Sequence, residues 1–388
     1  MKINLSDPIS QFAHILQSEL FPRLEPVLGE ISDRHALFIA TCAMVPFSRY
    51  LPCGRWNRRP SKDRLAIARA FIAKSIFGYA HTRQLLHALR YDSSLRSLCG
   101  WKQSQQLPHE STFSRAFAEF AQSELPHFAH QCLIASLHSE QLVGHISRDS
   151  SAVEGREYFV TPVDKKKKKE PKPKGKSKPG AKKGQNRRMT QEARLALGTR
   201  IERQLQMTDP AAMLAEIPTG CDIGAKRSSK GNTMYWRGYK LHLDVADGGI
   251  PITALLTSAS VHDSQVAIPM MHITSKRVTY LYDVMDSAYD AVAIRTASEK
   301  LNHRPIIQPH TKPKPKTQVP IRIKLPPEME PAEKRRYRQR TTVERAYSRL
   351  KDEFGARTVR VRGPKKVFAH LMFGVLALTV DRLLKMHK

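Results

Sequence analysis

The sequence predicts a mixed α/β protein whose amino-terminal third is helical. Three observations lead to this fold class: apolar residues recur at helical spacing in the first third, strand-like runs follow, and the chain ends in a long apolar helical segment. With 388 residues the chain is longer than one hydrophobic core usually organises. We therefore expect a helical domain over residues 1–138 and an α/β domain over 139–388.

The amino-terminal helices are predicted from their apolar faces. Residues 62–80 and 81–91 each place apolar side chains on one side, and Ser111 is the expected N-cap of a helix that carries three phenylalanines. A further helix is expected over residues 126–137. About twenty residues separate the second helix from the third, whereas the usual DNA-reading helix pair needs a turn of about three or four residues. A simple helix-turn-helix is therefore excluded.

The α/β domain is predicted to begin with a short strand, LVGHISRD (142–149), that ends in an acid. A hairpin at Gly248-Gly249 joins the next two strands. The expected strands after the first are 239–247, 251–259, 278–285 and 303–310, and the expected helices are 190–205, a long stretch from Pro331, and Lys365–Met386, which should pack on the sheet.

A low-complexity insertion at about 164–189 interrupts this domain. Lys, Pro and Gly dominate it without apolar periodicity, so it cannot offset the entropy cost of ordering, and we expect it to be disordered. Its lysines suit non-specific contact with phosphates. A solubilising linker is the alternative.

Charge is the strongest bulk property. Lys and Arg number 65 against 35 Asp and Glu, a net charge of +30, which favours a polyanionic partner such as DNA, RNA or an anionic membrane. A membrane is disfavoured because no apolar run approaches the ~20 residues that span a bilayer, and no signal peptide is recognisable. The five cysteines form no CxxC pair, which disfavours zinc fingers and disulfides and indicates a cytoplasmic protein. We favour DNA binding for the helical domain, with a structural or dimerising cap as the alternative.

Three acids are candidates for phosphodiester chemistry with magnesium, which needs converging carboxylates. Asp149 and Asp286 each follow a predicted strand, although each alone could equally be a cap or turn residue. Glu344 lies on a predicted helix, in one arc of roughly 60° with Tyr337, Arg340 and Lys351. The alternative for Glu344 is an exposed ion pair with Arg340.

The residues Tyr337, Arg340, Glu344 and Lys351 have the gaps of the YREK signature and so resemble the DDE transposases of bacterial insertion sequences. DSAYDA at Asp286 resembles the D-x-G-Y-D block of that family, with Ala288 in place of Gly. VHDSQVA (261–267) resembles an HDS element, whose Asp263 we do not count as a ligand. The amino-terminal helices are similar to the helical domain of related transposases.

The resemblance implies a ribonuclease-H-like catalytic core. It implies that Asp149, Asp286 and Glu344 hold two Mg²⁺ ions, with Mn²⁺ as a substitute, and that Tyr337, Arg340 and Lys351 contact DNA. The implied partners are double-stranded DNA at the element ends and at the target, bound by a homodimer in the bacterial cytoplasm at the nucleoid, with no membrane.

Other polar residues in the predicted core are expected to be structural. We expect Asp244 and Asp283 to be structural or solvent-facing, and His145, His242 and His262 to form hydrogen bonds without binding metal. Three alternative functions stay open: a transposase that has lost activity and acts as a DNA-binding protein or repressor, a polycation that packs nucleic acid, and a different metal nuclease. The presence of all three acids, the apolar α/β half and the four-residue signature, respectively, argue against them.

Overall fold

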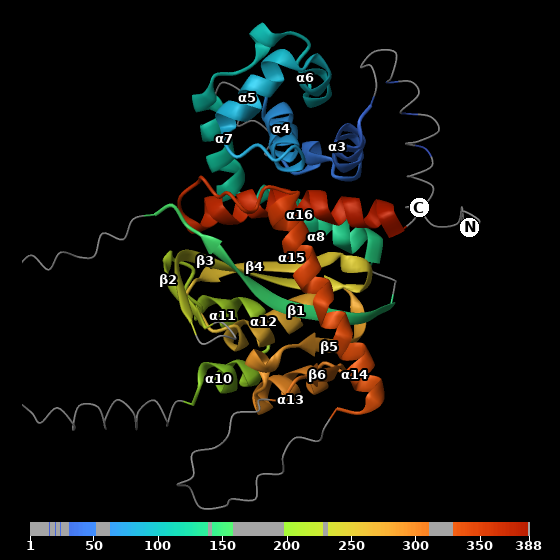
Figure 1. The fold of residues 1–388 in the computed structure, drawn as a ribbon, viewed down its shortest axis with the longest axis vertical. Helices are drawn as coiled ribbons and strands as arrows, with labels where there is room; N and C mark the ends of the chain where they lie inside the picture. The colour runs from blue at the N-terminus through green and yellow to red at the C-terminus, as the bar shows by residue number, and fades with distance from the viewer. Residues whose placement is uncertain are drawn as a thin grey trace, which may run out of the picture.

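The computed structural model describes residues 31–51, 63–138, 142–157, 198–227, 232–309 and 329–386, together with Ile15, Leu20 and Leu24. The predicted insertion at 164–189 lies outside these residues. In Figure 1 the amino-terminal helices form a layer at one end of the molecule, and the sheet lies at the other end, below the long carboxy-terminal helix. The fold is thus a mixed sheet flanked by helices, with a helical amino-terminal region, as predicted.

The amino-terminal region contains the four predicted helices and two that the sequence analysis did not single out. The helix with the three phenylalanines begins before Ser111: His109 is its N-cap, and the His109 Nδ1 accepts a hydrogen bond from the Ser111 backbone N–H at 3.2 Å. The helices are α3 (Asp33–Met44), α4 (Arg64–Ile76), α5 (Thr82–Tyr91), α6 (Ser93–Cys99), α7 (Glu110–Gln122) and α8 (Leu125–His138). Of these, α8 leaves the layer and lies below α16, next to the sheet, where His130 Nε2 is 3.0 Å from the Pro251 oxygen (Figure 1).

The described strands form one six-stranded sheet in the order β2-β3-β1-β5-β6, with β4 paired to β3. The β1–β3, β2–β3 and β3–β4 pairs are antiparallel, whereas β1–β5 and β5–β6 are parallel. The Gly248-Gly249 turn joins β3 to β4 as predicted, and both glycines have positive φ. The strands are β1 (Leu142–Glu154), β2 (Asp222–Arg227), β3 (Thr233–Ala246), β4 (Pro251–Ser258), β5 (Thr279–Met285) and β6 (Arg304–Ile307).

Strand β1 is longer than the sequence predicted. The expected strand ended at Asp149, but pairing with β3 continues through Glu154, which lies opposite Gly238. The prediction failed because the Ser-Ser step after Asp149 looks like a turn, whereas the partner strand β3 supplies hydrogen bonds along this whole stretch. Asp149 is therefore inside a strand and not at its end.

Two predicted helices are also corrected. Of the helix expected over 190–205, residues 190–197 lie outside the described residues; the described part is α10 (Arg200–Gln206), which begins after Gly198, with a φ of 70°, and Thr199 as its N-cap. The long helix from Pro331 is divided into α14 (Pro331–Tyr337), a 3₁₀ turn over Arg338–Arg340, and α15 (Thr341–Asp352). The other helices around the sheet are α11 (Pro210–Ala215), α12 (Ser264–Ser275) and α13 (Val292–Lys300).

Helix α16 (Pro364–Met386) connects the two layers. The Phe373 ring lies against Phe47, Phe71 and Phe117 of the amino-terminal layer, at centroid distances of 6.4, 5.7 and 6.3 Å. The same apolar cluster includes side chains of α15 and β3. α16 is long and apolar enough to cross a membrane, but 83% of its apolar window is buried within the protein. It is the central core helix between the helical layer and the sheet.

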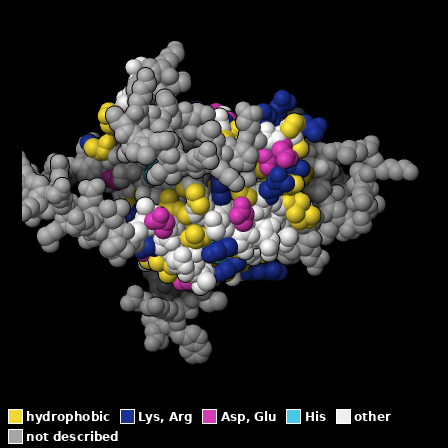
Figure 2. All heavy atoms as spheres, turned by 90° about the horizontal axis from the view of Figure 1, so that it is seen from below, with side chains coloured by type: hydrophobic (Ala, Val, Ile, Leu, Met, Phe, Trp, Pro, Cys, Tyr) yellow, Lys and Arg dark blue, Asp and Glu magenta, His cyan; other side chains and the backbone are white. Residues whose placement is uncertain are grey.

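The surface at the sheet end is chemically mixed. Figure 2 views the molecule from below, and on this face the described Lys and Arg side chains stand among acidic and apolar ones. On this face the described Lys and Arg side chains therefore do not form one continuous basic patch.

Candidate active site

Asp149 and Asp286 lie at the same level of two neighbouring parallel strands. The register of β1 and β5 pairs Ser147 with Val284, the last pair between them, and each aspartate stands two residues further along its strand. Asp286 directly follows β5, as predicted, and caps the next 3₁₀ turn by accepting a hydrogen bond from the Ala288 N–H at 2.9 Å. We call these two residues the acid pair.

The charged forms of the two carboxyl groups in the acid pair are disfavoured. Burial raises the pKa of Asp149 to about 6, and the nearby Asp286 and Asp263 add to the rise, which the Ser150 N–H and Arg340 partly oppose. Burial also raises the pKa of Asp286, with a further contribution from Asp263. Carboxylates crowded in this way favour protons or cations.

Glu344 is brought to the same side of the sheet by α15. The Tyr347 hydroxyl, one turn after Glu344, contacts the backbone oxygens of Asp149 and Leu241 at 2.9 and 2.7 Å. This contact fixes α15 across β1 and β3. The Glu344 carboxylate itself is 47% exposed and forms an ion pair with Arg340 at 2.7 Å. Among the described residues, no three His, Cys, Asp or Glu side chains are grouped closely enough to hold one metal ion.

A 3₁₀ turn interrupts the helical stretch on which the arc of four residues was expected. The 3₁₀ turn separates Tyr337 from the helix of Glu344, and the Tyr337 hydroxyl donates to Gln308 Oε1 at 2.9 Å. Arg340 lies beside Glu344 and within electrostatic reach of Asp149. The Lys351 Nζ donates to Ser151 Oγ at 2.7 Å, and Ser151 lies on β1 two residues beyond Asp149. Tyr337 also lies against Arg340, whose Cζ is 5.9 Å from the centre of its ring, and within electrostatic reach of Asp286, so Tyr337, Arg340 and Lys351 all border the acid pair.

Asp263 is a fourth acid that the sequence analysis set aside. It precedes α12 and pairs with Lys240 on β3, at 3.0 Å between Lys240 Nζ and Asp263 Oδ1. Its charge acts on Asp149 and on Asp286, so the fold brings it to the acid pair. The signal that could have found it is its position: like Asp286, it follows closely on a buried strand, here β4.

The residues present fit a divalent cation at the acid pair. The donor atoms are carboxylate oxygens, which Mg²⁺ prefers. The hydroxyl of Tyr289 supplies a second observation: it is buried without a hydrogen-bond partner, and the charges of Asp149, Asp263 and Asp286 all act on it. A cation with its water would relieve both the crowding of the acids and this unpaired hydroxyl. One oxygen of the Glu344 carboxylate, Oε1, already accepts a hydrogen bond from Arg340.

The other acids of the core are structural. Arg148 is fully buried; its guanidinium forms two hydrogen bonds of 2.7 Å with Asp244 and an ion pair of 3.3 Å with Asp283. These residues join β1, β3 and β5 beneath the acid pair. The structural role expected for Asp244 and Asp283 is confirmed, but both are fully buried, so a solvent-facing position is wrong.

The three histidines form hydrogen bonds or ion pairs, as expected. The His145 Nδ1 pairs with Asp247, and the buried His242 Nε2 lies 2.9 Å from Thr257 Oγ1. His262 Nδ1 lies 2.8 Å from Ser264 Oγ, at the start of α12.

Comparison with family models agrees with this geometry. A model described as "Transposase DDE domain" matches residues 149–380, more than half of the chain, and its match begins at Asp149 itself. The chain belongs to the DDE transposase family. A second model, "Transposase domain (DUF772)", matches residues 41–119 in the helical layer of the transposase. No curated protein and no solved structure matches the chain.

Membership of the family establishes the coarse chemistry. The mixed sheet of the transposase is a ribonuclease-H-like core, its partner is DNA, and its family normally uses a divalent metal. Both matches agree with the sequence-based assignment, although neither bears on the four-residue signature at Tyr337–Lys351.

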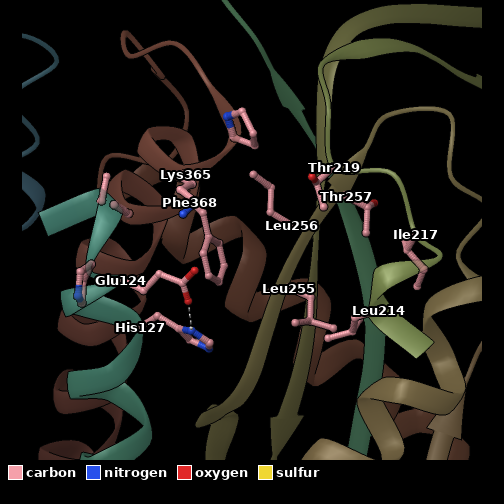
Figure 3. A pocket seen from close by; sticks show the side chains of 14 residues that line it. Glu124, His127, Leu214, Ile217, Thr219, Leu255, Leu256, Thr257, Lys365 and Phe368 are labelled. Atoms are coloured by element: carbon pink, nitrogen blue, oxygen red, sulfur yellow. Dashed lines mark ion pairs between the residues drawn. The ribbon is translucent and has the colours of Figure 1, made fainter. Parts of the chain in front are cut away.

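A separate cavity of about 370 Å³ lies away from the acid pair. Figure 3 shows Phe368 of α16 on one side of it and Leu255 and Ile217 on the other, with the Glu124–His127 ion pair at its α8 wall. The lining is mainly apolar and includes none of the predicted site residues. The lining of this cavity is therefore distinct from the acid pair.

Proposed function

We propose that the transposase binds the terminal inverted repeats of an insertion sequence and catalyses DNA cleavage and strand transfer. In this scheme water attacks a phosphodiester at the element end, and the freed 3′-hydroxyl later attacks target DNA. The observation that carries the proposal is the alignment of Asp149 with Asp286 on parallel strands, beside a helix that presents Glu344. Both DNA partners, element end and target, would meet this edge of the sheet.

We assign the metal-holding role to Asp149, Asp286 and Glu344. Two Mg²⁺ ions, with Mn²⁺ as a substitute, would activate the attacking oxygen and stabilise the leaving oxygen when they lie about 3.5–4 Å apart. Strands β1 and β5 fix the positions of the two aspartates. Glu344 would bind the metal ions in place of its ion pair with Arg340. Released from Glu344, the Arg340 guanidinium is free to hold a phosphate of the DNA.

We assign DNA contacts to Tyr337, Arg340 and Lys351. Arg340 and Lys351 border the acid pair through Glu344 and Ser151, which suits cations that hold the phosphates on either side of the cleaved bond. Tyr337 lies against Arg340 and within electrostatic reach of Asp286, and would help to position the substrate strand there. We place additional DNA binding in residues 1–138, with the catalytic domain over 139–388, and the match at residues 41–119 supports this division.

The deciding experiment is excision of the gene with its native flanks from a plasmid by purified protein and Mg²⁺. The wild type is compared with Asp149→Asn, Asp286→Asn and Glu344→Gln. We expect cleavage at the flanking repeats to fall at least ~100-fold in each variant, because each loses several kcal/mol of charge stabilisation. Glu353→Gln is the matched control, since Glu353 at the end of α15 pairs with Arg349.

The alternative is a transposase-derived DNA-binding protein or repressor without activity. Binding to the flanks without cutting, equal in wild type and variants, would support that alternative. We further propose that two protomers pair the DNA ends, as synapsis requires. Mass photometry of the protein on paired ends should give a dimer, and a monomer there would exclude this arrangement.

A further inference from the structure

A two-stranded ribbon projects from the sheet next to the acid pair. Its strands are β2 (Asp222–Arg227) and the first part of β3, Thr233–Arg237. Among the described strands, this part of β3 pairs with β2 alone, because the pairing of β3 with β1 begins at Gly238 and that with β4 at Tyr239. The ribbon therefore presents both of its faces beyond the sheet.

The ribbon exposes apolar side chains that a monomer would normally bury. Met234 is 70% exposed, Tyr235 is 72% exposed and Ile223 is 55% exposed. Because neighbouring residues on a strand point to opposite faces, Met234 and Tyr235 lie on different sides of the ribbon. The Trp236 indole covers Gly224, where no Cβ would fit, and donates to the Tyr239 oxygen at 3.2 Å. The exposed side chains thus stand on a rigid base.

The position and charge of the ribbon indicate its partner. Lys226 is the cross-strand neighbour of Met234, and its charge acts on both Asp286 and Lys351. Met234 therefore lies on the ribbon beside the place where the cleaved phosphodiester would bind. Exposed aromatic and apolar groups between cations suit DNA, whose bases stack and whose phosphates are anionic.

We propose that the β2–β3 ribbon inserts into the DNA beside the scissile phosphate, where Met234 and Tyr235 contact bases that have left the helical stack. The inference rests on the proposed function and adds the part of the DNA that this ribbon recognises. A two-stranded ribbon fits the major groove of DNA, and apolar side chains of this size act as wedges between base steps in other DNA-binding proteins. The effect would be to separate the strands locally and present one of them to the acid pair.

The test uses full-length protein without divalent ions and two DNA probes of the same sequence. One probe is a blunt duplex, and the other is a fork that carries 2-aminopurine at the junction. The double variant Met234→Ala/Tyr235→Ala should bind the fork about tenfold more weakly than the wild type, because it loses a stacked base. Its affinity for the blunt duplex should change less than about twofold, since phosphate contacts dominate there. The change in 2-aminopurine fluorescence on binding should be lost.

Leu142→Ala is the matched control, because Leu142 is also exposed, at 62%, and stands at the start of β1, at the opposite end of the strand from the Asp149 segment. It should behave as the wild type on both probes. Equal affinity of wild type and double variant for the fork would overturn the proposal. β2 is also an edge strand of the described sheet, and edge strands can pair with another chain. If the double substitution changes the mass of the free protein and leaves fork binding unchanged, the ribbon joins two copies and the DNA proposal is wrong.

The experiment separates this proposal from the proposed function. Fork binding needs no cleavage. If the wild type fails to excise its element but binds the fork about tenfold more tightly than the double variant, the ribbon proposal holds and the proposed function is wrong. Conversely, if the wild type excises its element and the double variant binds the fork as tightly as the wild type, the proposed function holds and the ribbon proposal is wrong.

Discussion

Tyr347 joins the helix of Glu344 to the strand of Asp149 through one hydroxyl group. That hydroxyl lies 2.9 Å from the Asp149 oxygen and 2.7 Å from the Leu241 oxygen, and the tyrosine is buried. The third acid is therefore positioned by a contact with the backbone of the first. Substitutions at Tyr347, and at Asp263, Asp149 and Arg148 nearby, should therefore have measurable effects.

Tyr347→Phe should loosen α15 on the sheet. We expect the free energy of unfolding to fall by about 1–3 kcal/mol, because buried oxygens lose their donor. DNA cleavage should slow as Glu344 becomes less well placed, while DNA binding is retained. Tyr337→Phe is the control, since its hydroxyl bonds to the exposed Gln308, and should change stability by less than about 0.5 kcal/mol. Urea unfolding measures both, and equal losses in the two variants would contradict the prediction.

Asp263→Asn should slow cleavage without altering DNA binding. The substitution removes a charge that acts on both members of the acid pair and leaves Lys240 without its partner. We expect the cleavage rate at limiting Mg²⁺ to fall roughly 10–100-fold, the range found when residues that support metal ligands are replaced. Asp209→Asn is the control, because asparagine also caps helices and Asp209 caps α11. Equal Mg²⁺ titration curves for wild type and Asp263→Asn would show that Asp263 is structural.

The stability of the metal-free protein should depend on pH through Asp149. Burial raises its pKa from 3.8 to about 6, so the folded state binds this proton more tightly than the unfolded state. The contribution of Asp149 to stability is therefore lost as pH rises from about 4 through about 6. In EDTA, Asp149→Asn should raise the Tm above the wild-type value at pH 7.5, and the gain should shrink toward pH 4. A gain of equal size at both pH values would point to a cause other than ionisation.

Arg148→Met should be among the most destabilising single substitutions in the core. It leaves Asp244 and Asp283 buried without their cation, which costs about 3–5 kcal/mol. Replacing all three residues with leucine should recover much of that loss, because a buried ion cluster can be exchanged for apolar packing. Denaturant unfolding of both variants checks this, and an unchanged midpoint for Arg148→Met would show that the cluster is unimportant.

Much of the fold was predictable because it depends on local pattern. The periodicity of residues 62–91, the Gly248-Gly249 turn and the apolar segment Lys365–Met386 each specify their element without reference to distant residues. The extent of β1 was not predictable in this way, because Ser150–Glu154 is held by β3. The 3₁₀ turn that separates Tyr337 from Glu344 also escaped the helical pattern, since its residues suit either helix type.

The sequence by itself determined the residue types of the site, their order along the chain, the strongly basic charge and the α/β class. The tertiary structure decided which of these residues meet. The register of β1 with β5 aligns Asp149 with Asp286, the turn before α12 adds Asp263, and Arg340 holds Glu344 aside. These outcomes depend on pairing between strands far apart in sequence and on burial, neither of which a local pattern of side chains can specify.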